Sequence, residues 1–129
     1  MTDDRAVILC VDDDPDILSF LRTVLEGAGY AVVGAESAEA GLRAWRETTA
    51  DAVIVDLMME EVDSGLGLTR ELRAAGCRAP IFLLSSVGDS LHLATEAAPL
   101  GLAGVFQKPL ARQHLLAVLA AALADARLR

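Results

Sequence analysis

Long apolar runs and cysteines are both scarce in this sequence of 129 residues. The longest apolar run covers residues 115–124. A helix that crosses a membrane needs about 20 apolar residues, so we expect no membrane segment. Cys10 and Cys77 are the two cysteines, too few for a disulfide framework or a zinc cluster. We therefore expect two free thiols, with Cys10 in the core and Cys77 in a loop.

Positive charge is scarce as well. Lysines and arginines number 11 against 19 aspartates and glutamates, which leaves a formal net charge of −8. Such an acidic chain is a poor electrostatic partner for nucleic acid or for an anionic membrane, so we expect direct binding to neither. The first four residues include two acids where a signal peptide has basic residues, and we expect a cytoplasmic protein.

Apolar residues are abundant, at 53%, and the length suits one domain with a proper core. Short apolar runs alternate with segments of helical periodicity. The expected strands are residues 6–11, 30–35, 52–55, 81–84 and 103–107. The expected helices are residues 15–27, a segment capped by Ser37, residues 65–75, a shorter segment between Asp89 and Ala98, and residues 110–126. This alternation predicts an α/β fold, with a parallel sheet covered on both faces.

Polar residues directly follow the apolar runs. In open α/β sheets the ligand site lies at the carboxyl ends of the strands, so these residues should converge. They are Asp12, Asp13 and Asp14 after the first run, Asp56 after the third, Ser85 and Ser86 after the fourth, and Lys108 after the fifth. Clustered carboxylates either raise a pKa or hold a cation, and a few oxygen ligands suit Mg²⁺. With Mg²⁺ bound and Lys108 opposite, one carboxylate can attack a phosphoryl group while the Ser85 hydroxyl donates to it.

Four segments together resemble the receiver domain of bacterial response regulators. They are ILCVDDDPDI (residues 8–17), VDLMM (residues 55–59), LSS (residues 84–86) and Lys108-Pro109. Each is weak alone, but all four occur in order, each at an expected strand end. The resemblance covers nearly the whole chain. It implies a flavodoxin-like, doubly wound five-stranded parallel sheet, (βα)5, with strand order 2-1-3-4-5, and a single receiver domain over residues 1–129 with no output domain in this chain.

The resemblance also implies roles for individual residues. Asp56 would be the phosphoryl acceptor. Asp12, Asp13, Asp56 and the Met58 carbonyl would bind Mg²⁺. Ser85 would be the switch hydroxyl, and Lys108 would pair with the phosphoryl oxygens. The donor would be a sensor histidine kinase or a histidine phosphotransfer protein. The domain would modify itself without substrate turnover. It would act on a downstream protein through its fourth and fifth helices, which are also a candidate homodimer surface.

The sequence departs from the receiver pattern at two places, so other functions stay open. Residues 59–65 read MEEVDSG, without the usual proline and with one apparent insertion. The family's aromatic switch position, three residues before Lys108, is Val105, and the adjacent Phe106 should point to the other face of its strand. One alternative is therefore a phosphorylation-independent pseudo-receiver that serves as an interaction module. Others are a phosphatase similar to the haloacid dehalogenases and, less favoured, a flavodoxin-like cofactor binder.

The last expected helix leaves two interpretations. Its large apolar residues, which spread over more than one stripe, are Leu115, Leu116, Val118, Leu119 and Leu123. Some of them would face outward as a partner or dimer surface. Alternatively, the helix is simply rich in alanine with scattered exposed apolar residues.

Overall fold

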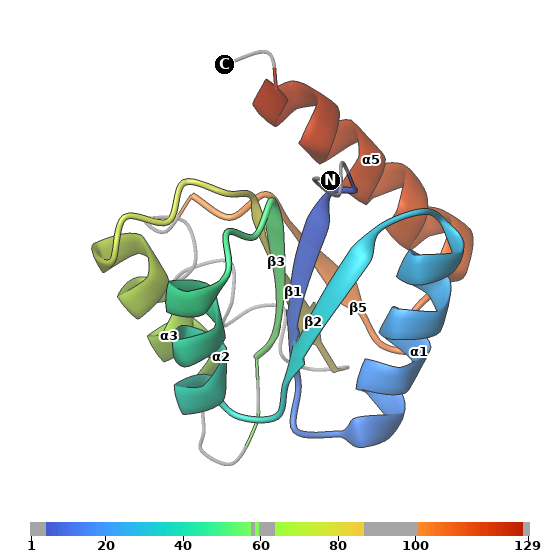
Figure 1. The fold of residues 1–129 in the computed structure, drawn as a ribbon. Coiled ribbons are helices and arrows are strands. Elements are labelled where there is room, and N and C mark those ends of the chain that lie inside the picture. Colours follow the sequence, from blue (N-terminus) through green and yellow to red (C-terminus); the bar gives the residue numbers. More distant parts are fainter. Residues whose placement is uncertain (1–4, 58, 60–63, 87–100, 128–129) are drawn as a thin grey trace.

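A computed structural model describes residues 5–57, 59, 64–86 and 101–127. The described residues form a five-stranded sheet with helices on both faces (Figure 1). The strands are β1 (Val7–Val11), β2 (Ala31–Ala35), β3 (Ala52–Asp56), β4 (Ile81–Ser85) and β5 (Gly104–Gln107). The helices are α1 (Pro15–Gly27), α2 (Ala38–Glu47), α3 (Ser64–Ala74) and α5 (Arg112–Arg127). The helix expected between Asp89 and Ala98 lies outside the described residues.

All pairs of neighbouring strands are parallel, and their order is β2-β1-β3-β4-β5. The predicted fold and strand order are therefore confirmed. β3 and β4 each run one residue further than expected, because Asp56 pairs with Leu84 and Ser85 pairs with Gln107 in the ladder. Two of the predicted site residues are thus held by the sheet itself.

Side chains of the central strands alternate between two cores. Val53 and Val55 of β3 pack in the core beneath α2 and α3, whereas Ala52 and Ile54 pack in the core beneath α1 and α5. Figure 1 shows these two helix pairs on opposite sides of the sheet. Burial on both faces explains why the central strands are continuous apolar runs.

Capping residues fix where the first two helices begin. Asp14 is the N-cap of α1, where its side chain accepts from the Asp16 N–H, and Pro15 follows at the first helical position. Ser37 caps α2 by accepting from the Ala40 N–H at 3.0 Å. Both starts agree with the sequence signals, because these residue types satisfy backbone N–H groups that have no partner within the helix.

The buried stripe of α5 is narrower than the sequence suggested. Leu115, Leu119 and Leu123 are buried four residues apart, and Leu116 and Val118 are half-buried at the margins. Among the described residues, the large apolar side chains that are exposed are Phe20 and Val105, neither of them on α5. The outward positions of α5 are mainly alanine and polar residues, so this surface agrees with the alanine-rich interpretation. Partner binding there stays a prediction.

Both cysteines are free thiols and both are buried. Cys10 lies in the core as expected, where burial raises the pKa of its thiol to about 12. Cys77 follows α3 outside any helix or strand, yet its side chain is buried as well. In the described part of the chain, no helix is both long and apolar enough to cross a bilayer.

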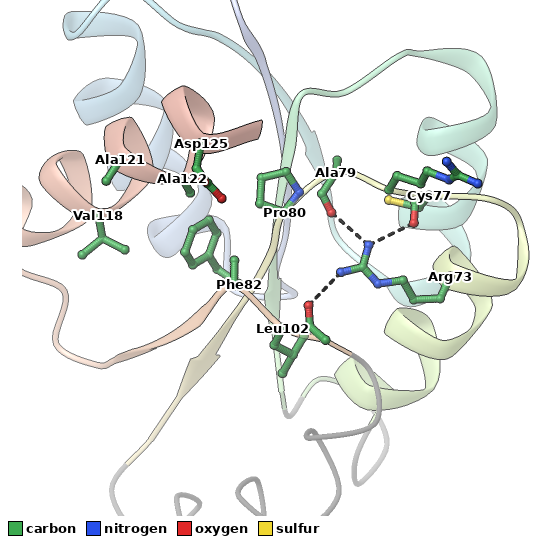
Figure 2. A pocket seen from close by; sticks show the side chains of 13 residues that line it. Arg73, Cys77, Ala79, Pro80, Phe82, Leu102, Val118, Ala121, Ala122 and Asp125 are labelled. Atoms are coloured by element: carbon green, nitrogen blue, oxygen red, sulfur yellow. Dashed lines mark hydrogen bonds between the residues drawn. The ribbon is translucent and has the colours of Figure 1, made fainter. Parts of the chain in front are cut away.

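A hollow of about 1120 Å³ lies at the amino ends of β4 and β5, beside the C-terminal half of α5 (Figure 2). Arg73 of α3 occupies one wall. Its guanidinium donates to the carbonyl oxygens of Cys77 at 2.9 Å, Ala79 at 3.0 Å and Gly101 at 3.1 Å. Arg73 therefore ties the segments that enter β4 and β5 to the end of α3.

Gly41 lets α2 approach β1 closely. A Cβ at this position would lie 2.9 Å from Val11 Cγ2 and 3.1 Å from Leu68 Cδ2, which is closer than packed carbon atoms tolerate. Val11 directly precedes Asp12 in the chain. The absence of a side chain at position 41 therefore sets how closely α2 packs beside the strand that carries Asp12.

Gly41→Ala should lower the free energy of unfolding by about 1–3 kcal/mol, because the added methyl overpacks this contact. Gly67→Ala in α3 is the matched control, since nothing lies within 4 Å of a Cβ there. The control should be neutral or stabilising by up to about 1 kcal/mol, as alanine favours helix over glycine. Urea unfolding measures both variants. Equal effects of the two substitutions would contradict the close approach.

Candidate functional site

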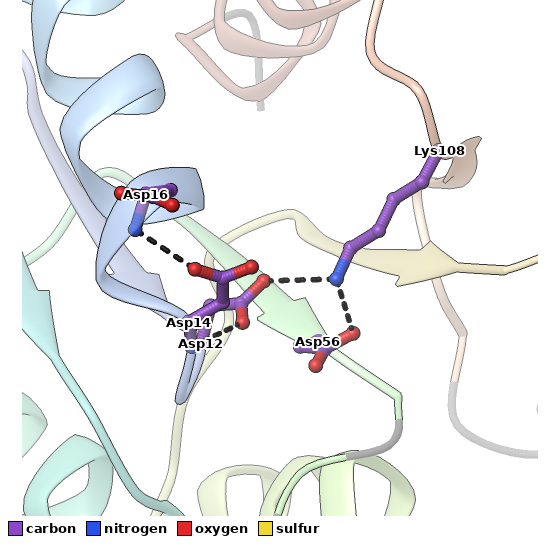
Figure 3. A network of polar contacts seen from close by, with 5 residues as sticks. All are labelled: Asp12, Asp14, Asp16, Asp56 and Lys108. Atoms are coloured by element: carbon purple, nitrogen blue, oxygen red, sulfur yellow. Dashed lines mark hydrogen bonds and ion pairs between the residues drawn. The ribbon is translucent and has the colours of Figure 1, made fainter.

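Four strands bring the predicted site residues to the carboxyl edge of the sheet. Asp56 and Ser85 end β3 and β4, and Asp12 and Lys108 directly follow β1 and β5. These strands are neighbours in the order β1, β3, β4, β5, so their ends adjoin. Figure 3 shows Asp12, Asp56 and Lys108 pointing toward one another. The expected convergence is therefore present for these three residues.

Asp12 is completely buried, at 0% exposure. Its backbone N–H donates to the Ala35 carbonyl at 3.0 Å, and its Oδ1 accepts from the Asp14 N–H at 2.9 Å. Its Oδ2 lies 3.2 Å from Lys108 Nζ, a charge contact without good hydrogen-bond geometry. One carboxylate oxygen thus holds the turn into α1, and the other contacts the ammonium group of the cluster.

Lys108 joins the two buried carboxylates. Its Nζ lies 3.2 Å from Asp12 Oδ2 and 3.3 Å from Asp56 Oδ1 (Figure 3). Asp56 is only 4% exposed, so this contact is far less screened by water than a surface ion pair. The backbone N–H of Lys108 also donates to the Ser85 carbonyl at 2.8 Å. The backbone of Lys108 is therefore fixed to β4, which limits where its ammonium group can lie.

Burial and like charge perturb the titration of this cluster. Burial raises the pKa of Asp56, the neighbouring Asp12 adds to the effect and Lys108 opposes it, with a result of about 6. Burial also raises the pKa of Asp12, against the Asp14 N–H and Lys108. Burial lowers the pKa of Lys108, but the two carboxylates outweigh it and the net shift is upward. Burial and mutual repulsion thus disfavour the charged forms of Asp12 and Asp56, and a further cation would favour them.

Three carboxylates are close enough to share such a cation. One oxygen from each of Asp12, Asp13 and Asp56 can be chosen so that all lie within 4.8 Å of one another. Asp13 is exposed, whereas the other two are buried, so the group is open to solvent on one side. An all-oxygen set with room for water fits Mg²⁺. Met58, the predicted carbonyl ligand, lies outside the described residues.

Ser85 brings a buried hydroxyl that finds no hydrogen-bond partner in the described part of the chain. It is 1% exposed, and its Oγ has no hydrogen-bond partner among the described residues. A buried polar atom without a partner costs free energy, so such groups in native proteins call for a ligand, a water or a role. The position agrees with the predicted switch hydroxyl, but that role stays a prediction.

Asp14 does not join the cluster in the way that its position suggested. The Asp14 side chain is turned to cap α1, where its Oδ1 accepts from the Asp16 N–H at 2.9 Å. Ser86 is exposed, one residue beyond the end of β4. Helix capping takes Asp14 away, because the first N–H groups of α1 need an acceptor.

The residues before Lys108 lie as predicted from strand alternation. Val105 is 45% exposed, whereas Phe106 is 2% exposed on the opposite face. The Phe106 ring stacks on Phe82 at a centroid distance of 5.1 Å and meets the His114 ring edge-on at 5.8 Å. Phe106 is thus a core residue, and the aromatic switch position holds an exposed valine.

Comparisons with known proteins identify the family of this chain. The family model described as "Response regulator receiver domain" matches residues 8–120. The chain belongs to this family. As a receiver domain, it falls in a signalling family of two-component systems rather than a family of enzymes in the usual sense.

Two curated relatives illustrate the match. The transcriptional regulatory protein ZraR of Escherichia coli K12 is 36% identical over 96% of this chain, and the response regulator protein TodT of Pseudomonas putida F1 is 32% identical over 95%. These alignments cover 28% of ZraR and 53% of TodT. The receiver domain described here thus spans about a quarter and about half of these longer proteins.

Two solved structures share this fold over nearly their whole length. A response regulator receiver domain protein from Clostridium thermocellum aligns with a TM-score of 0.86 and 31% identity, covering 95% of this chain and 98% of that one. The chemotaxis protein CheY4 of Vibrio cholerae aligns with a TM-score of 0.84 and 27% identity, covering 92% and 98%.

Asp56→Asn should stabilise the metal-free protein at pH 7 by about 1–3 kcal/mol. Asp56 has a higher pKa when folded, so the folded state binds its proton more tightly. The penalty for its charge is absent near pH 4, grows as the pH rises through about 6 and is full at pH 7. The increase in the free energy of unfolding of Asp56→Asn should therefore be small near pH 4 and full at pH 7. Denaturant unfolding from pH 4 to 8 in EDTA measures it.

Glu47→Gln, which removes an exposed carboxylate at the end of α2, is the control and should not reproduce the stabilisation of Asp56→Asn. Added Mg²⁺ should shrink the gain of Asp56→Asn, because a bound cation removes the repulsion that the substitution relieves. A stabilisation that is equal at pH 4 and pH 7 would contradict a buried charge as its source.

Proposed function

We propose that this receiver domain is a phosphorylation-dependent switch in which Asp56 accepts a phosphoryl group. The donor would be a phosphohistidine on a sensor histidine kinase or on a histidine phosphotransfer protein. The arrangement of Lys108 carries the proposal. One ammonium group contacts both Asp12 and Asp56, at 3.2 and 3.3 Å, at the edge of a sheet where both carboxylates are buried.

The chemistry needs a carboxylate that can reach phosphorus. An Asp56 oxygen attacks the phosphorus atom, the bond from phosphorus to the histidine nitrogen breaks, and the imidazole leaves with the electron pair. An acyl phosphate on Asp56 results. The domain modifies itself once in this reaction and is not an enzyme that turns over a substrate.

Asp12, Asp13 and Asp56 are the residues that would hold Mg²⁺. The ion supplies positive charge that stabilises the developing charge on the phosphoryl oxygens. Lys108 adds a cation from the β5 side, and the Ser85 hydroxyl is a donor that a phosphoryl oxygen could satisfy. Together the positive charges of Mg²⁺ and Lys108 would offset the repulsion from the carboxylates, so that a phosphoryl anion could bind.

Phosphorylation would then change the contacts of Lys108 and Ser85. A new anion on Asp56 attracts the Lys108 ammonium group and gives the Ser85 hydroxyl an acceptor. Ser85 ends β4 and Lys108 directly follows the adjacent β5, and the Lys108 N–H donates to the Ser85 carbonyl. We propose that this shift alters a surface around α5 and the segment before β5, where a downstream protein or a second copy of the chain would bind.

Incubation with acetyl phosphate and Mg²⁺ should add a single phosphoryl group, detected by intact mass. Asp56→Asn should give no adduct, because it replaces the attacking oxygen. Ser85→Ala should still give one, more slowly, since it removes a hydrogen-bond donor and not the acceptor. An adduct of equal yield on Asp56→Asn would place the acceptor elsewhere and overturn the assignment.

An interaction module that is never phosphorylated is the second candidate, and the exposed Val105 at the aromatic switch position favours it. Calorimetric titration with Mg²⁺ at pH 7 separates the two. A working receiver should bind one Mg²⁺, and Asp13→Asn should weaken binding by about tenfold or more, because one of three carboxylates is lost. Glu39→Gln on α2 is the control. Absence of Mg²⁺ binding by the unsubstituted protein would favour the interaction module.

A further inference from the structure

One edge of the sheet is formed by β2, which pairs only with β1 in the described part of the chain. The Ala31 N–H and the Ala35 carbonyl both form hydrogen bonds on the β1 side of the strand. Backbone groups of successive residues alternate in direction along a strand, so those of Val32 and Gly34 point away from β1. The outer edge of β2 therefore presents N–H and C=O groups that another strand could use.

The composition of β2 does little to keep another strand away. Its sequence is Ala-Val-Val-Gly-Ala, without a charge or a proline. Gly34 is exposed and places no side chain at the edge. A hollow of about 620 Å³ lies beside the edge, between α1 and the start of α2. Uncharged, accessible edges of this kind are where strands of separate molecules pair.

Arg22 of α1 lies across this edge. Its Nη1 donates to the outward carbonyl of Val32 at 3.3 Å and to Glu26 Oε2, one turn further along α1, also at 3.3 Å. Its Nη2 would lie 3.6 Å from a Cβ at Gly34. The guanidinium group thus reaches both residues whose backbone groups point outward.

A strand that pairs with β2 would have to displace the Arg22 guanidinium group or remove it from water. The exposed contacts of Arg22 contribute little stability, so the strength of these bonds is not the main obstacle. Desolvation is the larger obstacle, because taking a charged group out of water costs free energy even beside an opposite charge. Arg22 therefore opposes pairing mainly through its charge.

The β2 strand of a second copy is the partner that fits this edge. A two-fold axis would place it antiparallel to β2, with the same outward groups at Val32 and Gly34 facing their counterparts. Such pairing would also bring two Arg22 guanidinium groups to one shared edge, where like charges repel.

We infer that Arg22 is a guard residue, which keeps the β2 edge from pairing with the β2 edge of a second copy of this chain. The inference goes beyond the proposed function and does not depend on it, because neither Arg22 nor β2 takes part in the phosphoryl transfer.

Sedimentation equilibrium, without Mg²⁺ or a phosphodonor, tests the inference. Arg22→Ala should associate with itself about tenfold more tightly than the unsubstituted protein, or more, because the substitution uncovers the edge. Arg22→Lys keeps a flexible cation at the edge, so its association should stay within about threefold of that of the unsubstituted protein.

Arg43→Ala is the matched control. Arg43 forms the same kind of exposed pair, with Glu39 one turn away on α2 at 3.5 Å, but it does not line the hollow beside β2. The control removes the same charge and a similar ion pair, so it should leave self-association unchanged.

Hydrogen exchange identifies the surface through which Arg22→Ala associates. The N–H groups of Val32 and Gly34 should exchange more slowly at high protein concentration, because they gain acceptors across the interface. Adding Gly34→Pro to Arg22→Ala should restore weak association, since proline has no N–H to donate and is tolerated on edge strands.

The inference is wrong if Arg22→Ala associates no more tightly than the unsubstituted protein. It is equally wrong if Arg43→Ala associates as tightly as Arg22→Ala, since the change in net charge would then be the cause. Association of Arg22→Ala with unchanged exchange at Val32 and Gly34 would place the interface elsewhere and overturn the inference as well. None of these results bears on Asp56 as the phosphoryl acceptor.

Discussion

The contact of one ammonium group with two buried carboxylates is the interaction on which the candidate site depends. Lys108 reaches Asp12 and Asp56 at the end of the sheet, where burial makes charge costly for both acids. A single cation does not balance the acids gathered there. The site is therefore electrostatically incomplete, and its stability depends on what binds to it. This dependence is the physical basis of the proposed response to a metal ion and to a phosphoryl group.

The sheet explains why these groups respond together. Asp56 and Ser85 are members of the ladder, and Lys108 is bonded through its backbone N–H to the Ser85 carbonyl. Asp56 and Ser85 thus belong to strands that are buried along their whole length. Under the proposed function, a new charge on Asp56 would act on the backbone of β4 and of the segment that follows β5, and not only on two side chains. The buried Phe106, stacked on Phe82, joins the same two strands on the α1 and α5 side.

Much of the fold and the site could be predicted from local sequence signals. Continuous apolar runs gave the strands, Asp14-Pro15 gave the start of α1, and acids at strand ends gave the cluster of Asp12, Asp13 and Asp56. Strand alternation alone predicted that Phe106 faces away from Val105, and the structure adds that Phe106 is buried. Arg73 could not be found in this way, because its partners are backbone carbonyls, which any residue supplies. The narrow buried stripe of α5 also depends on how the helix lies across the sheet, which periodicity does not determine.

The three bonds of Arg73 have a mechanical consequence. They hold the amino ends of β4 and β5 against α3, at the opposite end of the strands from Ser85 and Lys108. A strand fixed at one end pivots instead of sliding, so its displacement grows with distance from the fixed point. β4 is five residues long, about 15 Å from end to end. A tilt of a few degrees would thus leave the Arg73 end in place and move the Ser85 end by about 1 Å, the scale on which hydrogen bonds are made and broken.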